Sequence, residues 1–110
     1  MAGWYELNKH KNEQFGFVLK AGNGEVILTS EQYTTKTSAQ SGIASVQVNS
    51  PIDARYEKKT ASNNSPYFNL KALNGQVIGT SQMYSSTTAR DNGIESVKTN
   101  GPTTTIKDNT

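Results

Sequence analysis

The stretch LKAGNGEVILTS (Leu19–Ser30) returns 51 residues later as LKALNGQVIGTS (Leu70–Ser81). The same offset pairs Phe17 with Phe68, and about half of the 35 positions from Phe17 to Pro51 are identical in the second copy, without a gap. The chain therefore predicts two tandem repeats, residues 4–54 and 55–107, inside one compact domain that covers residues 1–110. Solenoid proteins need at least three repeats to cover their faces, so two repeats favour a closed pair.

Each repeat contains a segment with the periodicity of a β-strand. In FGFVLKA (residues 15–21), every second residue is apolar, so Phe17 and Leu19 are expected in the core and Lys20 on the opposite face. The Asn-Gly pairs at 23–24 and 74–75 predict type I′ hairpin turns into a following strand. A less regular strand, WYELNK in the first repeat and RYEKK in the second, precedes each hairpin.

After the hairpin the hydrophobic period changes to about 3.6, which indicates one helix in each repeat. Thr37 with Gln40, and Thr88 with Asp91, resemble capping boxes at the helix starts. Asn-Ser-Pro and Asn-Gly-Pro are expected to end the helices. Gly42 and Gly93 are interpreted as packing contacts that let a second backbone approach. The segments IDARYE and TTTIKD then offer a short closing strand.

Taken together, FVLKAGNGEVILTSEQY…GIASVQVN and FNLKALNGQVIGTSQMY…GIESVKTN resemble the YegP-like family of small uncharacterised proteins. The resemblance implies an α+β fold in which two β-β-β-α-β repeats with pseudo-two-fold symmetry share one antiparallel sheet, exchange their closing strands and pack their helices together. It implies no biochemical activity.

The family pattern also has an acid after the Asn-Gly turn, an acid two residues before the following Tyr and a Lys three residues after it. The first repeat keeps these charges as Glu25, Glu31 and Lys36, whereas the second has Gln76, Gln82 and Thr87. If the three charges formed a site, this chain would hold at most one intact copy.

Composition excludes several kinds of chemistry. The chain has 110 residues, a net charge of +2, no cysteine and a single histidine. Thiolate catalysis, disulfides and cysteine-based zinc sites are therefore excluded. His10 lies in a polar loop between lysines and is interpreted as a surface residue. We expect no cofactor, no metal site and no catalytic residue, and the sequence does not favour an enzyme. It shows neither a membrane span nor a signal segment, so we expect a cytoplasmic protein without a membrane partner.

Two places remain as candidate ligand sites. Tyr33 and Tyr84 precede the helices, next to hydroxyl-rich segments, and a helix N-terminus can bind an anion. They point to a cleft between the repeats that would bind a small anion or metabolite, as a binding protein or an enzyme.

The outward face of the sheet is the other candidate. Alternation places Lys20 and Lys71 there, together with Tyr67 and the candidates Trp4 and Arg55. Such a face could bind single-stranded nucleic acid weakly, although Glu6 and Glu57 are expected on it too. The leading hypothesis is a non-enzymatic binding or interaction module of unknown partner. We expect a monomer of pseudo-dimeric architecture, because each repeat of about 50 residues needs the other to bury its apolar face.

Overall fold

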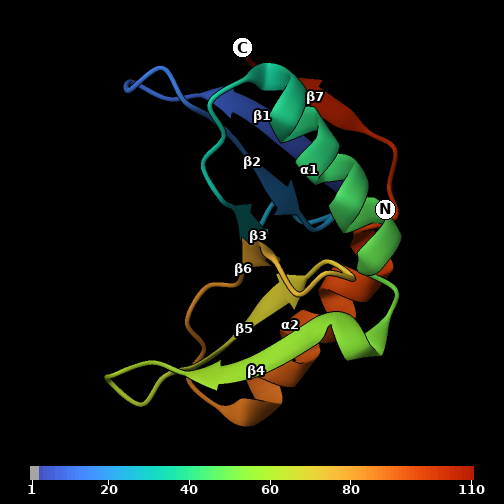
Figure 1. Ribbon diagram of the computed structural model, residues 1–110. Helices are drawn as coiled ribbons and strands as arrows, with labels where there is room; N and C mark the ends of the chain where they lie inside the picture. The colour runs from blue at the N-terminus through green and yellow to red at the C-terminus, as the bar shows by residue number, and fades with distance from the viewer. Residues whose placement is uncertain (1–2) are drawn as a thin grey trace.

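The computed structural model of the protein describes residues 3–110, which form one seven-stranded sheet and two α-helices (Figure 1). The first repeat contributes β1 (Trp4–Lys9), β2 (Phe15–Lys20), β3 (Val26–Ser30) and α1 (Lys36–Asn49). A short 3₁₀ segment, η1 (Asp53–Arg55), leads into the second repeat, which contributes β4 (Tyr56–Thr60), β5 (Pro66–Lys71), β6 (Val77–Thr80), α2 (Thr87–Asn100) and β7 (Ile106–Asp108). The strand order is β4-β5-β6-β3-β2-β1-β7.

The two repeats are joined through β3 and β6, which pair antiparallel at the centre of the sheet. Thr29 lies opposite Thr80, and these two residues occupy the same position in their repeats. The pseudo-two-fold axis therefore passes between them. This confirms the expected α+β fold with a shared sheet.

The core lies between the helices and one face of the sheet. Tyr5, Leu19, Phe68 and Leu70 are fully buried on that face, as is Val97 of α2. Most of the strand residues that alternate with them, among which are Glu6, Val18 and Lys20, remain partly exposed on the other face. The two-residue period of the strands thus decides which side chains meet the helices.

Two reciprocal hydrogen bonds tie each repeat to the helix of the other. The hydroxyl of Tyr5 in β1 donates to the carbonyl of Gly101 after α2, at 2.6 Å. The hydroxyl of Tyr56 in β4 donates to the carbonyl of Ser50 after α1, at 2.7 Å. Burial raises the pKa of both phenols, so they stay protonated as donors at neutral pH. The helices themselves meet at these C-terminal ends, where the Cα of Gly101 lies against the side chain of Ser50.

Only one of the two expected closing strands is present, and it makes the sheet mixed rather than purely antiparallel. β7 leaves the second repeat and pairs parallel with β1 of the first, with Tyr5 opposite Ile106. The corresponding segment after α1 forms η1 and continues directly into β4. That segment cannot also cover the outer edge of β4, because the same residues start the next repeat.

The Asn-Gly hairpins are present, but the type I′ turn was the wrong prediction. Gly24 and Gly75 have φ near +86° and +85°, whereas the preceding asparagines keep negative φ. The N–H of Gly24 donates to the carbonyl of Ala21, and the N–H of Ala21 donates to the carbonyl of Glu25. This is the pattern of a type I turn followed by a left-handed glycine and a bulge, and the strand register shifts next to it.

The helix starts also differ from the prediction. Thr35 and Ser86 are the N-caps, and their hydroxyls accept hydrogen bonds from the N–H groups of Ser38 and Ala89. Thr37 and Thr88 lie inside the first turn. Each helix start is rich in hydroxyl residues, so several could serve as the cap. The helices end at Asn49 and Asn100, as expected.

Candidate binding groove between the repeats

Tyr33 and Tyr84 lie in equivalent places between the sheet and the two helices. Tyr33 stacks on Phe17, with ring centroids 6.3 Å apart, and Tyr84 stacks on Phe68 at 6.4 Å. Both phenols are half-buried. Each hydroxyl lies against a helix glycine: a Cβ added to Gly93 would come within 2.2 Å of the Tyr84 oxygen.

This contact explains why Gly42 and Gly93 are glycines. The expectation of a packing contact holds, but the group that comes close is a phenol and not a second backbone. Sequence alone could not identify the neighbour, because the tyrosine and the glycine are nine residues apart and belong to different elements.

Tyr84 lines a groove of about 220 Å³ between the repeats. The first repeat contributes Glu25 and Asn23 from the turn between β2 and β3. The second repeat contributes polar side chains before and along α2. The complete lining is Ala21, Asn23, Glu25, Ile27, Gln82, Tyr84, Ala89, Asn92, Gly93 and Ser96. Polar groups from two repeats therefore converge on one small cavity.

The charge of this groove is negative. Glu25 is the single ionisable carboxylate in the lining, and no lysine or arginine lines it within the described residues. Burial raises the pKa of Tyr84. A hydrogen bond with Gln82 lowers this pKa, and the nearby charge of Glu25 raises it, so the net shift is upward. The phenol is therefore neutral at physiological pH and can act as a hydrogen-bond donor.

The three charges of the family pattern are not gathered at one place. The groove contains Glu25, but its lining includes neither Glu31 nor Lys36. Glu31 lies near Tyr33 instead. Burial is the main cause that raises the pKa of Tyr33, and the negative charge of Glu31 is the second. The ammonium of Lys36 lies 2.6 Å from the carboxylate of Asp108 and so fastens α1 to β7. Within the groove, Glu25 of the first repeat lies with Tyr84, the tyrosine of the second.

The helix N-termini give little support to an anion site. The N–H of Ala89, which lines the groove, donates to the hydroxyl of Ser86 at 3.0 Å. The equivalent N–H of Ser38 donates to Thr35 at 3.1 Å. The caps therefore use donors that an anion would need.

The outward sheet face carries paired charges. Lys20 lies 3.1 Å from Glu6, and Lys71 lies 3.1 Å from Glu57. Trp4 donates to Glu6 at 2.9 Å, and the ammonium of Lys107 lies 4.4 Å from the centre of the Trp4 ring.

Arg55 departs from the expected place. It lies in η1, and its Nε donates to Oδ1 of Asn49 at 3.0 Å. The predicted face thus exists without Arg55, and its two candidate lysines already have carboxylate partners.

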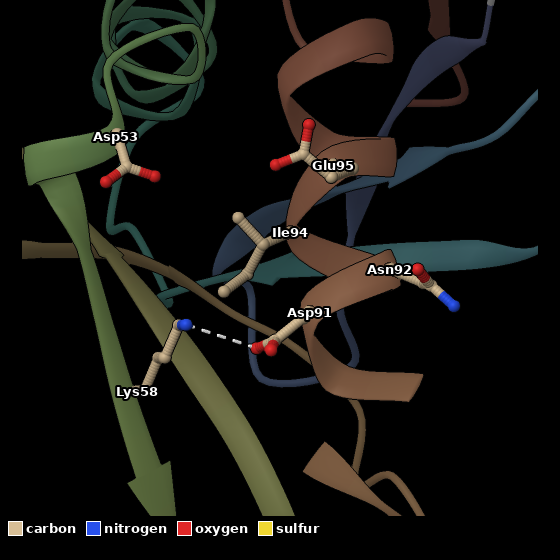
Figure 2. A pocket seen from close by; sticks show the side chains of 6 residues that line it. All are labelled: Asp53, Lys58, Asp91, Asn92, Ile94 and Glu95. Atoms are coloured by element: carbon tan, nitrogen blue, oxygen red, sulfur yellow. Dashed lines mark ion pairs between the residues drawn. The ribbon is translucent and has the colours of Figure 1, made fainter. Parts of the chain in front are cut away.

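A second hollow of about 190 Å³ lies between β4 and α2 (Figure 2). Its acids all have partners. The ammonium of Lys58 is 3.3 Å from Asp91, and that of Lys98 is 2.7 Å from Asp53 and 3.2 Å from Glu95. Each acid of this hollow is therefore already engaged by a lysine.

Residues 3–110 contain no group of three or more His, Asp or Glu side chains arranged to hold a metal ion. In the same part of the chain, neither helix has the length and apolar character needed to cross a membrane. His10 is exposed in the loop after β1, and its ring lies against Gly16.

The chain is similar throughout its length to proteins whose names state no activity. The family described as a domain of unknown function, DUF1508, matches twice, at residues 10–57 and 61–108. A UPF0339 protein of Shewanella oneidensis is 73% identical over 98% of both chains. The UPF0339 protein YegP of Escherichia coli is 66% identical over the full length of both.

Solved structures agree with the fold. The solution structure of the Shewanella oneidensis UPF0339 protein matches with a TM-score of 0.92, covering 98% of this chain and 92% of that one. The solution structure of E. coli YegP, titled a protein of unknown function, matches with a TM-score of 0.94, covering 99% and 94%.

Proposed function

Because the chain belongs to the DUF1508 family, with two copies of that domain in tandem, we propose that it is a non-enzymatic binding module that takes a small polar ligand into the groove between its repeats. The observation that carries this proposal is the convergence of Glu25 from the first repeat with Gln82, Tyr84 and Asn92 from the second on one cavity. Binding sites commonly join an apolar wall to a few converging polar groups, and Ala21 and Ile27 supply that wall.

The groove is better suited to binding than to catalysis. General acid–base chemistry needs a titratable group whose pKa lies near the working pH. The pKa of Tyr84 moves upward, away from neutrality, because burial disfavours the phenolate. A neutral phenol beside amide side chains can orient a ligand by hydrogen bonds without exchanging a proton.

The nucleic-acid alternative has less support. Lys20 and Lys71 would have to give up their contacts with Glu6 and Glu57 to reach a phosphate. If single-stranded RNA binds at low salt, replacing both lysines by alanine should weaken binding and its dependence on salt. The cytoplasmic location and the monomeric state stay predictions from the sequence.

A ligand screen tests the groove directly. Full-length protein is screened by thermal shift against cationic, neutral and anionic metabolites, and each hit is mapped by amide chemical shifts in ¹⁵N-labelled protein. A ligand at 100 times its dissociation constant would add about 2.7 kcal/mol to the free energy of unfolding. We expect hits that shift Glu25, Tyr84 and Asn92. If no class of compound shifts these residues, the proposal is wrong.

A further inference from the structure

The acidic side chains of the protein fall into two groups. The chain has nine acids, and ion pairs engage seven of them within residues 3–110. The two without an ion pair in this part of the chain are Glu25 and Glu31. Both lie beside the tyrosines between sheet and helices, and the other repeat has a glutamine at each position, Gln76 and Gln82.

From this distribution we infer that the groove selects a small organic cation, with the carboxylate of Glu25 as its counter-ion. The inference rests on the proposed function and adds the charge of the ligand. A carboxylate in a groove without a basic neighbour raises the local concentration of cations and repels anions. The remaining lining suits the same ligand, because the carbonyl oxygens of Gln82 and Asn92 can accept hydrogen bonds from an ammonium group.

Local structure holds Glu25 at the mouth of this groove. Its N–H donates to Oδ1 of Asn23 at 3.0 Å, and its carbonyl accepts from the N–H of Ala21 at 2.9 Å. The bulged turn thus fixes the backbone from which the carboxylate extends. Because the groove is also lined by α2 of the other repeat, a ligand held by Glu25 would contact both repeats.

The pseudo-two-fold axis relates this groove to a place beside Tyr33 and α1. The equivalent residues there are Gln76 in place of Glu25 and Glu31 in place of Gln82. The first repeat would therefore supply the carboxylate at both places, Glu25 from its hairpin turn at one and Glu31 from the segment before its helix at the other.

The volume limits the size of the ligand. The groove has a volume of about 220 Å³. This is smaller than typical drug-sized sites of about 300–1,000 Å³, so a compact amine or quaternary ammonium fits the groove better than a nucleotide.

A pair of isosteres tests the charge of the ligand. Choline and its neutral analogue 3,3-dimethyl-1-butanol have the same shape and differ by one positive charge. Methylammonium and acetate complete the panel, and each compound is titrated into full-length ¹⁵N-labelled protein. We expect choline or methylammonium to shift the amides of Glu25, Tyr84 and Asn92, with at least about tenfold weaker binding of the neutral analogue and weaker binding at high salt.

Glu25→Gln is the matched variant, because it installs the residue that the second repeat has at position 76. It should weaken cation binding at this groove about tenfold or more and leave shifts around Tyr33 unchanged. Glu13→Gln removes the same charge from an exposed loop. It should change neither the affinity of the groove for cations nor the amide shifts around Tyr33. Equal binding of choline and its neutral analogue, a preference for acetate, or an unchanged affinity in Glu25→Gln would overturn the inference. Neutral or anionic hits at the groove would still leave the proposed function standing.

Discussion

Gly93 shows how one residue can position a side chain that lines the groove. Its missing side chain leaves room for the hydroxyl of Tyr84, which stacks on Phe68 and lines the groove. The same relation joins Gly42 with Tyr33 in the first repeat. A glycine inside a helix costs up to about 1 kcal/mol relative to alanine, so close packing must compensate for it.

Gly93→Ala should therefore destabilise the protein despite its better helix propensity. The added Cβ would lie 2.2 Å from the phenol oxygen and 2.6 Å from the adjoining ring carbon, so the whole ring must move. We expect a net loss of about 1–2 kcal/mol in the free energy of unfolding, measured by urea denaturation, because overpacking outweighs the propensity gain. Glu95→Ala, at an exposed position of the same helix, should stay within about 0.5 kcal/mol of wild type. A stabilised Gly93→Ala would show that the tyrosine moves freely.

At the level of elements, the repeated pattern was sufficient to predict each helix and the strands of each hairpin. Alternation placed Phe17 and Leu19 in the core and Lys20 on the outer face, because strand geometry requires it. Turn type and cap position were not predictable to the same degree, since an Asn-Gly pair and a run of hydroxyl residues each suit more than one local conformation.

The groove was predictable only in outline. Tyr33 and Tyr84 stood out because they recur before each helix, but nothing local indicated that Glu25 would lie with Tyr84. That proximity depends on the pairing of β3 with β6, which brings the turn of one repeat to the helix of the other. Sequence reasoning also passed over Asn92, which matches no motif, and it noted Gln82 only as the residue that stands where the family pattern has an acid.

The closing strand β7 should be sensitive to acid. Lys36, followed by hydrogen bonds from Thr110, holds the pKa of Asp108 well below its usual range. A carboxyl group whose pKa is lower in the folded state stabilises the protein above the unfolded pKa of about 4, and this contribution is lost as the pH falls. Asp108→Asn should therefore be less stable than wild type at pH 7, and the difference should shrink below about pH 4.

Urea denaturation from pH 7 to pH 2 measures that difference, and hydrogen exchange at Asn109 reports on β7 itself. The N–H of Asn109 donates to the carbonyl of Leu7 in β1, at 2.8 Å. Glu31→Gln serves as the control, because it removes an acid without an ion pair in the described chain. Its difference in stability from wild type should not shrink in this way as the pH falls. A difference between Asp108→Asn and wild type that is constant with pH would contradict the ion-pair account.

β4 is an edge strand of the sheet, unlike β1, its equivalent in the first repeat, which pairs with β7. Lys58 occupies the position that Leu7 has in the first repeat, where β7 lies alongside and the exposed fraction is 1%. In the second repeat, no strand formed by residues 3–110 pairs with β4 on that side, and Lys58 is exposed. Charged side chains on open edges hinder pairing with other strands.

Lys58→Leu should therefore increase self-association relative to wild type. The substitution removes the ion pair with Asp91 and also the positive charge that hinders pairing of β4 with another strand. We expect a concentration-dependent rise in sedimentation coefficient for Lys58→Leu. Lys11→Leu, in the exposed loop after β1, serves as a control for added hydrophobicity and should behave as wild type. Equal sedimentation of both variants at all concentrations would show that Lys58 does not protect β4.

For the whole molecule, duplication in one chain allows unlike residues to face each other across the pseudo-two-fold axis. The side chain of Leu28 lies against Gly79, which is the equivalent residue in the second repeat. The side chain of Ser50 likewise lies against its equivalent, Gly101, and its buried hydroxyl has no hydrogen-bond partner among the described residues. Two identical halves would place two leucines or two glycines face to face. A tandem chain can place one large and one small residue there.

The exchange of Leu28 and Gly79 tests this complementarity. Leu28→Gly should leave a cavity and Gly79→Leu should overpack the axis, since a Cβ at Gly79 already lies 2.6 Å from the leucine. The double variant restores one leucine and one glycine across the axis, so it should be more stable than the sum of the single effects by roughly 1–3 kcal/mol.

Val18→Asn with Asn69→Val exchanges another unlike pair, but three strand spacings of about 4.8 Å separate these positions, so their effects should add. Urea denaturation of the four single and two double variants gives both coupling energies. Additive effects at Leu28 and Gly79 would mean that the axis tolerates either residue on either side, and size complementarity would then not explain why the two repeats differ there.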